Sequence, residues 1–209
     1  MRMYGGAQTT RSVDAQIQNP KRGCALTFRF GHDTSDCSPA RRGAGAAVRN
    51  SLGASPTLVL GFGNVLLSDD GAGVQLVERL RLELGPQAAE FVDGGTLSFS
   101  LLSYVEAADS MLVIDAADLK GAPGAIGLFE GAAMDEYLKS SRRRTVHEVG
   151  LIDLLDMARL QDCLPRQRAL LCIQPGRIDW CETLSAAVAA AMPEGARQAR
   201  ATLQRWKFT

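Results

Sequence analysis

The stretch Leu58-Val-Leu-Gly-Phe-Gly-Asn-Val-Leu-Leu-Ser-Asp-Asp-Gly-Ala-Gly-Val74 contains the first structural unit of this chain. It begins with a short apolar run that has the length and branching of a buried strand. Gly61 and Gly63 follow, and glycine allows a tight turn and the close approach of another group. Asp69 and Asp70 then precede a helical pattern of apolar residues. The stretch predicts a strand, a turn that carries two carboxylates, and a helix.

Neither of two common nucleotide-binding loops fits this turn. A dinucleotide fingerprint needs a third glycine three residues after the second, where this chain has Leu66. A phosphate-binding loop needs Gly-Lys-Ser/Thr, and no lysine is near. Carboxylates in a loop suit a cation instead. The alternative is that Asp69 or Asp70 is the N-cap of the following helix. Both aspartates cannot be the N-cap, so at least one of them remains available to bind a cation.

The composition is that of a globular domain with an appendage of different character. The 209 residues carry 23 basic and 23 acidic side chains, so the formal net charge is zero. Eight of the basic and three of the acidic residues precede Pro56, which leaves 15 basic and 20 acidic residues in the remainder. Residues 1–55 show no sustained periodicity, and we expect a disordered basic extension or a start codon assigned too far upstream. We therefore predict one domain over residues 56–209.

Charge, cysteine content and hydropathy exclude several classes of protein. The acidic remainder argues against nucleic acid as a partner. The five cysteines are odd in number and contain no Cys-x-x-Cys pair, which argues against a disulfide framework and a thiolate zinc site. A reducing cytoplasm is the simplest location. No apolar run approaches the ~20 residues that span a bilayer, so we expect no membrane insertion.

Strand and helix patterns alternate after Pro56. The predicted strands cover residues 57–62, 90–93, 110–115, 125–130 and 168–174. The predicted helices cover residues 71–84, 99–108, 147–160 and 184–206, the last of them broken at Met192-Pro193. Residues 131–146 are polar and are expected to form an exposed loop or a frayed helix. This alternation predicts an α/β fold with a largely parallel sheet that is covered on both faces.

Polar residues follow the ends of three predicted strands. Asp69 and Asp70 follow the first strand, Asp93 the second, and Asp115 ends the third, while His147 begins a later helix. Ligands of open α/β sheets bind beyond the carboxyl ends of the strands, so these side chains are candidates for one site. Carboxylates and an imidazole can bind a divalent metal or share a proton. Each acid could instead serve a turn, and the histidine could bond a backbone carbonyl.

Five motifs in order make the sequence similar to the maturation endopeptidases of nickel–iron hydrogenases. They are the glycine- and aspartate-rich stretch from Gly61 to Val74, Asp93-Gly-Gly-Thr96, Val113-Ile-Asp-Ala116, His147-Glu-Val-Gly-Leu-Ile-Asp-Leu-Leu155 and Ile173-Gln-Pro175. The similarity covers residues 57–192. It implies a three-layer α/β/α fold with a five-stranded, mostly parallel mixed sheet, in which the antiparallel strand lies at about residues 125–130.

The resemblance also implies an activity and a site. The family removes a C-terminal extension from the hydrogenase large-subunit precursor after nickel insertion. By motif position Asp70, Asp115 and His147 would contact nickel, which the substrate supplies, so no tightly bound cofactor is expected in the resting protein. Asp93 matches a further acid with a role in cleavage, and either Asp93 or Asp70 could activate the water. Ser68 lacks a recognisable partner base, so hydrolysis by water is expected rather than covalent catalysis.

Two other functions remain open from the sequence. A nickel-sensing assembly chaperone that does not cut would share the metal ligands, and would tolerate the loss of Asp93. A metallohydrolase acting on small molecules would hold its metal in the isolated protein.

Overall fold

The computed structural model describes residues 57–95, 99–141 and 146–207. The extension predicted over residues 1–55 lies outside these ranges. The element boundaries predicted from periodicity agree with the structure to within a few residues, with the differences given below. No helix in the described ranges combines the length and apolar character needed to span a bilayer.

The described residues form a five-stranded sheet with the order β2-β1-β3-β5-β4. The strands are β1 (Thr57–Phe62), β2 (Glu90–Gly95), β3 (Ser110–Ala116), β4 (Ile126–Glu130) and β5 (Gln167–Ile173). β4 runs antiparallel to β5, and the other three pairs of neighbours are parallel. The predicted mixed, mostly parallel sheet is therefore confirmed, including the position of its antiparallel strand.

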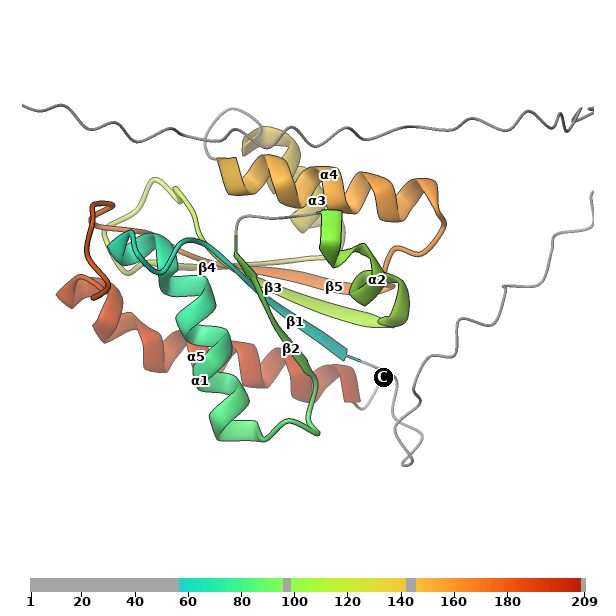
Figure 1. The fold of residues 1–209 in the computed structure, drawn as a ribbon, viewed down its shortest axis with the longest axis horizontal. Helices are drawn as coiled ribbons and strands as arrows, with labels where there is room; N and C mark the ends of the chain where they lie inside the picture. The colour runs from blue at the N-terminus through green and yellow to red at the C-terminus, as the bar shows by residue number, and fades with distance from the viewer. Residues whose placement is uncertain (1–56, 96–98, 142–145, 208–209) are drawn as a thin grey trace, which may run out of the picture. The chain divides into compact units, whose positions relative to one another are not determined.

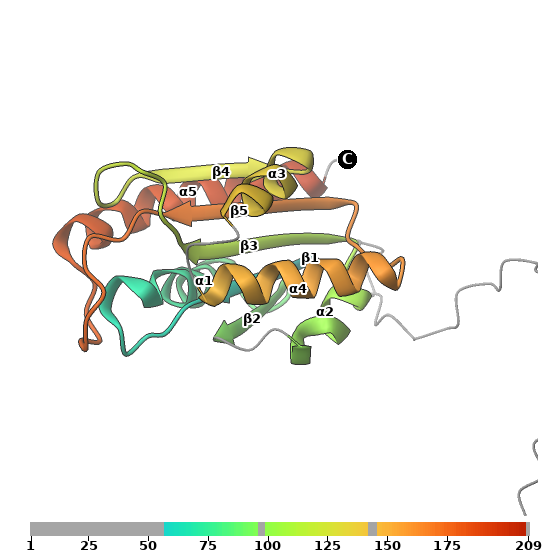
Figure 2. The same ribbon diagram turned by 90° about the horizontal axis from the view of Figure 1, so that it is seen from above.

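Helices cover both faces of the sheet, which confirms the three-layer α/β/α architecture (Figures 1 and 2). α1 and α5 pack on one face, and α2, α3 and α4 on the other. The helical elements are η1 (Ser68–Gly71), α1 (Ala72–Leu84), η2 (Phe99–Leu101), α2 (Leu102–Ala107), α3 (Ala132–Ser141), α4 (Val146–Leu160) and α5 (Ala186–Lys207).

Side-chain alternation along the central strands divides the core into two layers. In β1, Leu58 and Leu60 face the layer beneath α4, whereas Val59 faces the layer beneath α1 and α5. Every residue of β3 is buried. Central strands of this kind show continuous apolar runs because both faces of the sheet are covered. Each fully buried aliphatic side chain contributes about 1.5–3 kcal/mol to the stability of the fold.

The segment after β4 was expected to be an exposed loop or a frayed helix, and the structure shows a helix that is partly buried. Residues 132–141 form α3, and the side chains of Met134 and Leu138 are 0% and 3% exposed. These residues are four positions apart, so they lie on one side of the helix and enter the core together. Met134 and Leu138 are the two large aliphatic residues of this helix, and their packing against the sheet stabilises it. Residues 142–145 lie outside the described residues.

The last helix is continuous, so the break predicted at Met192-Pro193 is wrong. α5 runs through Pro193 without interruption. Proline removes one helical hydrogen bond and usually bends a helix. Here buried residues on both sides of the proline, Val188 and Met192 before it and Ala196 after it, pack into the same core layer. Tertiary packing therefore outweighs the local preference.

Candidate active site

Glycines bring the turn after β1 against the ends of the central strands. Gly63 has a φ of +127°, and a Cβ there would lie 1.9 Å from the carbonyl oxygen of Asp70. A Cβ on Gly73 would lie 2.4 Å from the carbonyl oxygens of both Ile114 and Phe62. Only residues without side chains fit at these positions, because backbone touches backbone. As a result η1, which carries Asp70, contacts the end of β3.

Asp70 and Asp115 are both buried carboxylates near this edge of the sheet. Asp70 is 8% exposed, and its Oδ2 accepts a hydrogen bond of 2.9 Å from the backbone amide of Asn64. Asp115 is 2% exposed and is the penultimate residue of β3. It alternates in phase with Met111 and Val113, which places it on the sheet face that α4 covers. Buried carboxylates at a strand edge are candidates for cation binding.

His147 is the second residue of α4. Figure 2 shows that α4 begins at the edge of the sheet where β3 and β5 end, because the helix runs back over the sheet before β5 starts. The backbone thus brings the elements of the three predicted ligands to one edge. The side chain of His147 lies outside the described residues. Among the described side chains, no three His, Cys, Asp or Glu residues are arranged to hold a metal ion. The metal site therefore stays a prediction.

Asp93 reaches the same edge in a different setting. It lies on β2 beside Gly61, and its side chain is exposed. Its Oδ1 accepts a 2.8 Å hydrogen bond from the amide of Gly95, which has a φ of +50°. Along β2, Asp93 is in phase with Phe91, which packs on the α1 side of the sheet. The structure does not bring Asp93 to the face that carries Asp115, and the contact with Gly95 is that of a turn residue.

Asp69 has a role that the sequence did not reveal. The N-cap of α1 is Gly71, and no side chain caps α1 or η1, so the capping alternative for Asp69 and Asp70 is wrong. Asp69 is 0% exposed. Its Oδ2 accepts hydrogen bonds from the amides of Gly176 (2.8 Å) and Arg177 (2.9 Å), and its Oδ1 accepts one from the amide of Ser185 (2.6 Å).

The pKa of Asp69 reflects these contacts. Burial raises the pKa, but the hydrogen bonds from Ser185, Gly176 and Arg177 stabilise the carboxylate and together lower the pKa below its usual value. Ser185 immediately precedes α5, and its Oγ accepts a hydrogen bond from the amide of Val188 in the first turn of that helix. Asp69 is therefore an ionised structural anchor at the start of a helix, a position that favours negative charge.

The loop that Asp69 holds, residues 174–185, is called here the clamped loop. Further bonds tie it to the turn that carries Asp70. Ser68 donates from its amide to the carbonyl oxygen of Cys181 (2.5 Å), and its buried Oγ donates to that of Thr183 (2.9 Å). Cys181 in turn donates from its amide to the carbonyl oxygen of Leu66. The hydroxyl of Ser68 therefore takes part in holding this loop. The Gln174-Pro175 motif that begins the loop was the only sequence signal for it.

Comparison with known proteins agrees with this architecture. The family model for hydrogenase maturation protease matches residues 74–201. A hydrogenase expression/formation protein, HoxM of Cupriavidus necator, is 32% identical over 152 residues, which cover 71% of this chain and 74% of HoxM. The hydrogenase 2 maturation protease of Escherichia coli is 31% identical over 124 residues, 58% of this chain and 74% of that protein.

Solved structures show the same relationship. The hydrogenase maturating endopeptidase HybD from Escherichia coli superposes with a TM-score of 0.66 at 29% sequence identity, over 72% of this chain and 93% of that one. HybD from Thermococcus kodakarensis, a nickel–iron hydrogenase maturation protease, gives a TM-score of 0.59 at 29% sequence identity. The match covers 70% of this chain and 97% of that one.

Proposed function

Because the chain belongs to the hydrogenase maturation protease family and is by class a peptidase, we propose that it removes the C-terminal extension of a nickel–iron hydrogenase large-subunit precursor after nickel insertion. The observation that supports this most directly is the pair of buried carboxylates, Asp70 and Asp115, on neighbouring elements at the carboxyl edge of the sheet. The proposed reaction takes place in the cytoplasm and needs neither nucleic acid nor membrane.

In this proposal nickel is part of the substrate. Asp70, Asp115 and His147 contact the nickel of the precursor and so report that its metal centre is filled. Asp70 and Asp115 are 8% and 2% exposed, so both carboxyl groups have lost most of their hydration. A cation that arrives with the substrate offsets the cost of burying a carboxylate, which favours binding of the nickel-loaded precursor over the empty one. The resting protein needs no tightly bound cofactor.

The proposed chemistry is hydrolysis by water. One acid, Asp70 or Asp93, takes a proton from a water molecule as the oxygen attacks the carbonyl carbon of the scissile bond. The proton then passes to the leaving amine as the C–N bond breaks. Holding the bond beside the acid supplies the advantage of proximity. The buried Oγ of Ser68, which donates to the carbonyl oxygen of Thr183, supports water rather than this serine as the nucleophile.

The test is incubation of the purified protein with nickel-loaded precursor, followed by intact mass measurement. We expect the mass of the precursor to fall by that of a C-terminal peptide with the wild type, and to stay unchanged with Asp70→Ala and His147→Ala. Asp153→Ala is the matched control, because Asp153 is an exposed acid on α4. Cleavage by both site variants would refute the ligand assignment.

Two other results would change the proposed function. A precursor that co-elutes with the protein but keeps its mass would favour the non-cleaving chaperone. Stoichiometric metal in the purified protein would favour a metallohydrolase that acts on small molecules.

A further inference from the structure

Exposed apolar side chains gather on two loops at the carboxyl edge of the sheet. Seven large apolar residues are exposed in the part of the chain that the structure describes, and four of them lie on these loops. Val65 and Leu66, in the turn before η1, are 40% and 44% exposed. Ile178 and Trp180, in the clamped loop, are 55% and 82% exposed. Single exposed apolar residues are ordinary, but a concentration of them marks an interaction site.

The two loops form one unit. Leu67 and Cys181 pair as an isolated parallel bridge, and the carboxylate of Asp69 holds the amides of Gly176 and Arg177. Figures 1 and 2 both show the loop before η1 and the clamped loop side by side. Loops that are already fixed lose little conformational entropy on binding, so a partner gains more from the contact.

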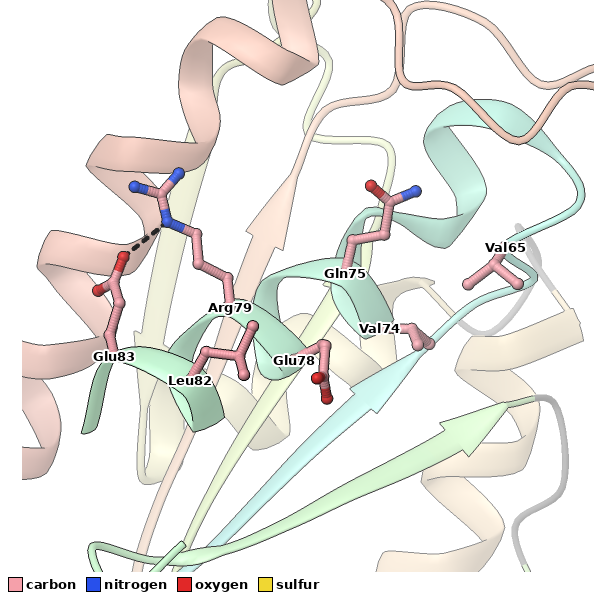
Figure 3. A pocket seen from close by; sticks show the side chains of 7 residues that line it. All are labelled: Val65, Val74, Gln75, Glu78, Arg79, Leu82 and Glu83. Carbon is pink, nitrogen blue, oxygen red and sulfur yellow. Dashed lines mark hydrogen bonds and ion pairs between the residues drawn. The ribbon is translucent and has the colours of Figure 1, made fainter. Parts of the chain in front are cut away.

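The apolar surface continues along α1. Val65 also lines an open groove of about 690 Å³, together with Val74 and the exposed side chain of Leu82 (Figure 3). The groove contains acidic residues, but these are neutralised. Glu78 pairs with Arg81 at 2.7 Å, and Glu83 pairs with Arg79 at 2.7 Å. Such a groove suits apolar side chains better than a charged ligand.

We propose that this surface, formed by Val65, Leu66, Ile178, Trp180 and the groove on α1, is the docking surface for an apolar segment of the substrate protein. The proposal rests on the proposed function. Its main support is continuity with the site, since Leu66 precedes Asp70 by four residues and the clamped loop is held by the neighbouring Asp69. The backbone of Val65 packs against Gly71, the neighbour of Asp70, so a segment docked on Val65 and Leu66 lies beside the turn that carries this carboxylate. Trp180 is the expected anchor, because exposed tryptophans often dominate binding energy.

Binding of nickel-loaded precursor to the full-length chain tests the proposal. We expect Trp180→Ala to raise Kd at least about tenfold, as for a central tryptophan at an interface. The loss should appear in KM for cleavage rather than in kcat. Leu160→Ala is the matched control, because Leu160 is 87% exposed at the end of α4, away from the carboxyl edge. We expect its Kd to equal that of the wild type.

A second measurement reports the contact itself. The chain has two tryptophans, so incorporation of 5-fluorotryptophan gives two ¹⁹F signals, which Trp206→Phe assigns. Addition of unlabelled precursor should shift or broaden the signal of Trp180 and leave that of Trp206 in place. An unmoved Trp180 signal in a complex that forms would overturn the docking proposal.

The outcomes separate this proposal from the proposed function. Binding that needs Trp180 but yields no cleavage would keep the docking surface and refute the peptidase reaction. Cleavage of the precursor, with the same Kd for Trp180→Ala and the wild type, would keep the peptidase reaction and refute the docking surface. Self-association that disappears in Trp180→Ala, with precursor binding unchanged, would assign the surface to a second copy of the chain and overturn the proposal.

Discussion

Asp69→Asn should destabilise the protein strongly although it changes neither the size nor the shape of the side chain. The carboxylate of Asp69 is fully buried and accepts three backbone amides, two through Oδ2 and one through Oδ1. Asparagine keeps one acceptor oxygen and turns an NH₂ group towards an amide donor. At least one hydrogen bond to a charged acceptor is lost, and the remaining hydrogen bonds are made to a neutral acceptor. At about 1.5–3 kcal/mol for a bond to a charged group, we expect a loss of about 2–4 kcal/mol.

Urea unfolding at pH 7, followed by circular dichroism, measures this loss. A loss of about 3 kcal/mol corresponds to a fall in Tm of about 10 °C for a domain of this size. Asp179→Asn is the matched control, because it makes the same chemical change within the clamped loop. Asp179 is 56% exposed and its ion pair with Arg177 spans 3.2 Å, so its loss should cost at most about 1 kcal/mol.

The effect has a defined pH dependence. The folded pKa of Asp69 is lowered, because its hydrogen bonds outweigh the effect of burial. The carboxylate therefore stabilises the fold at pH values above the unfolded pKa of about 3.9, and this stabilisation is lost as pH falls through the folded pKa. The difference between the wild type and Asp69→Asn should be constant near pH 7 and shrink below about pH 4. Equal stability at pH 7, or a difference that grows towards acid, would refute the assigned role of Asp69.

Three further predictions concern the scaffold. Gly63→Ala should abolish folding or lower the free energy of unfolding by more than about 4 kcal/mol, because the new Cβ would lie 1.9 Å from a carbonyl oxygen. Gly85→Ala, where φ is +79° and the space is open, should lower it by only about 1–3 kcal/mol. Similar losses for the two variants in chemical unfolding would contradict the steric explanation. Asp135→Ala should cost about 2 kcal/mol at pH 7, because the carboxylate accepts a 2.6 Å bond from Arg168 that is largely shielded from solvent. Burial raises the pKa of Asp135, but the arginines around it lower the pKa overall. The loss of stability in Asp135→Ala should therefore shrink below about pH 4 in chemical unfolding. A loss that does not change with pH would argue against the ion pair. Pro193→Ala should stabilise the protein by about 1–3 kcal/mol, since it restores a hydrogen bond within α5. An unchanged or lower Tm in calorimetry would show that the helix accommodates the proline without cost.

Much of the architecture could be predicted from local patterns. The run from Met111 to Ile114 is apolar throughout and predicted a strand over residues 110–115, and every residue of that strand is buried. The helical spacing of Val74, Leu76, Val77, Leu80 and Leu84 predicted the apolar side of α1, and Leu76, Val77 and Leu80 are buried in the structure. Such patterns are visible in sequence because the periods of strands and helices are properties of the backbone. The strand at residues 125–130 was predicted from the local pattern, but its antiparallel direction was implied only by the family resemblance.

The local patterns were misleading where distant contacts outweigh them. Pro193 predicted a break, yet α5 continues through it, with buried core residues on both sides of the proline. Residues 131–146 were predicted to be an exposed loop or a frayed helix, yet residues 132–141 form a helix whose Met134 and Leu138 are buried against the sheet. In each case burial of a few side chains supplies more free energy than the local propensity removes.

The candidate site divides in the same way. By itself the sequence determined that Asp70, Asp93 and Asp115 follow strands at one edge, because parallel strands end on the same side. The local pattern did not distinguish Asp69 from Asp70, since adjacent aspartates look alike in it, and only motif position in the family resemblance selected Asp70. Only the tertiary structure decided that Asp69 is the buried anchor of the clamped loop. The amides that it accepts lie 107 to 116 residues further along the chain, and no local period reports a hydrogen bond across that separation.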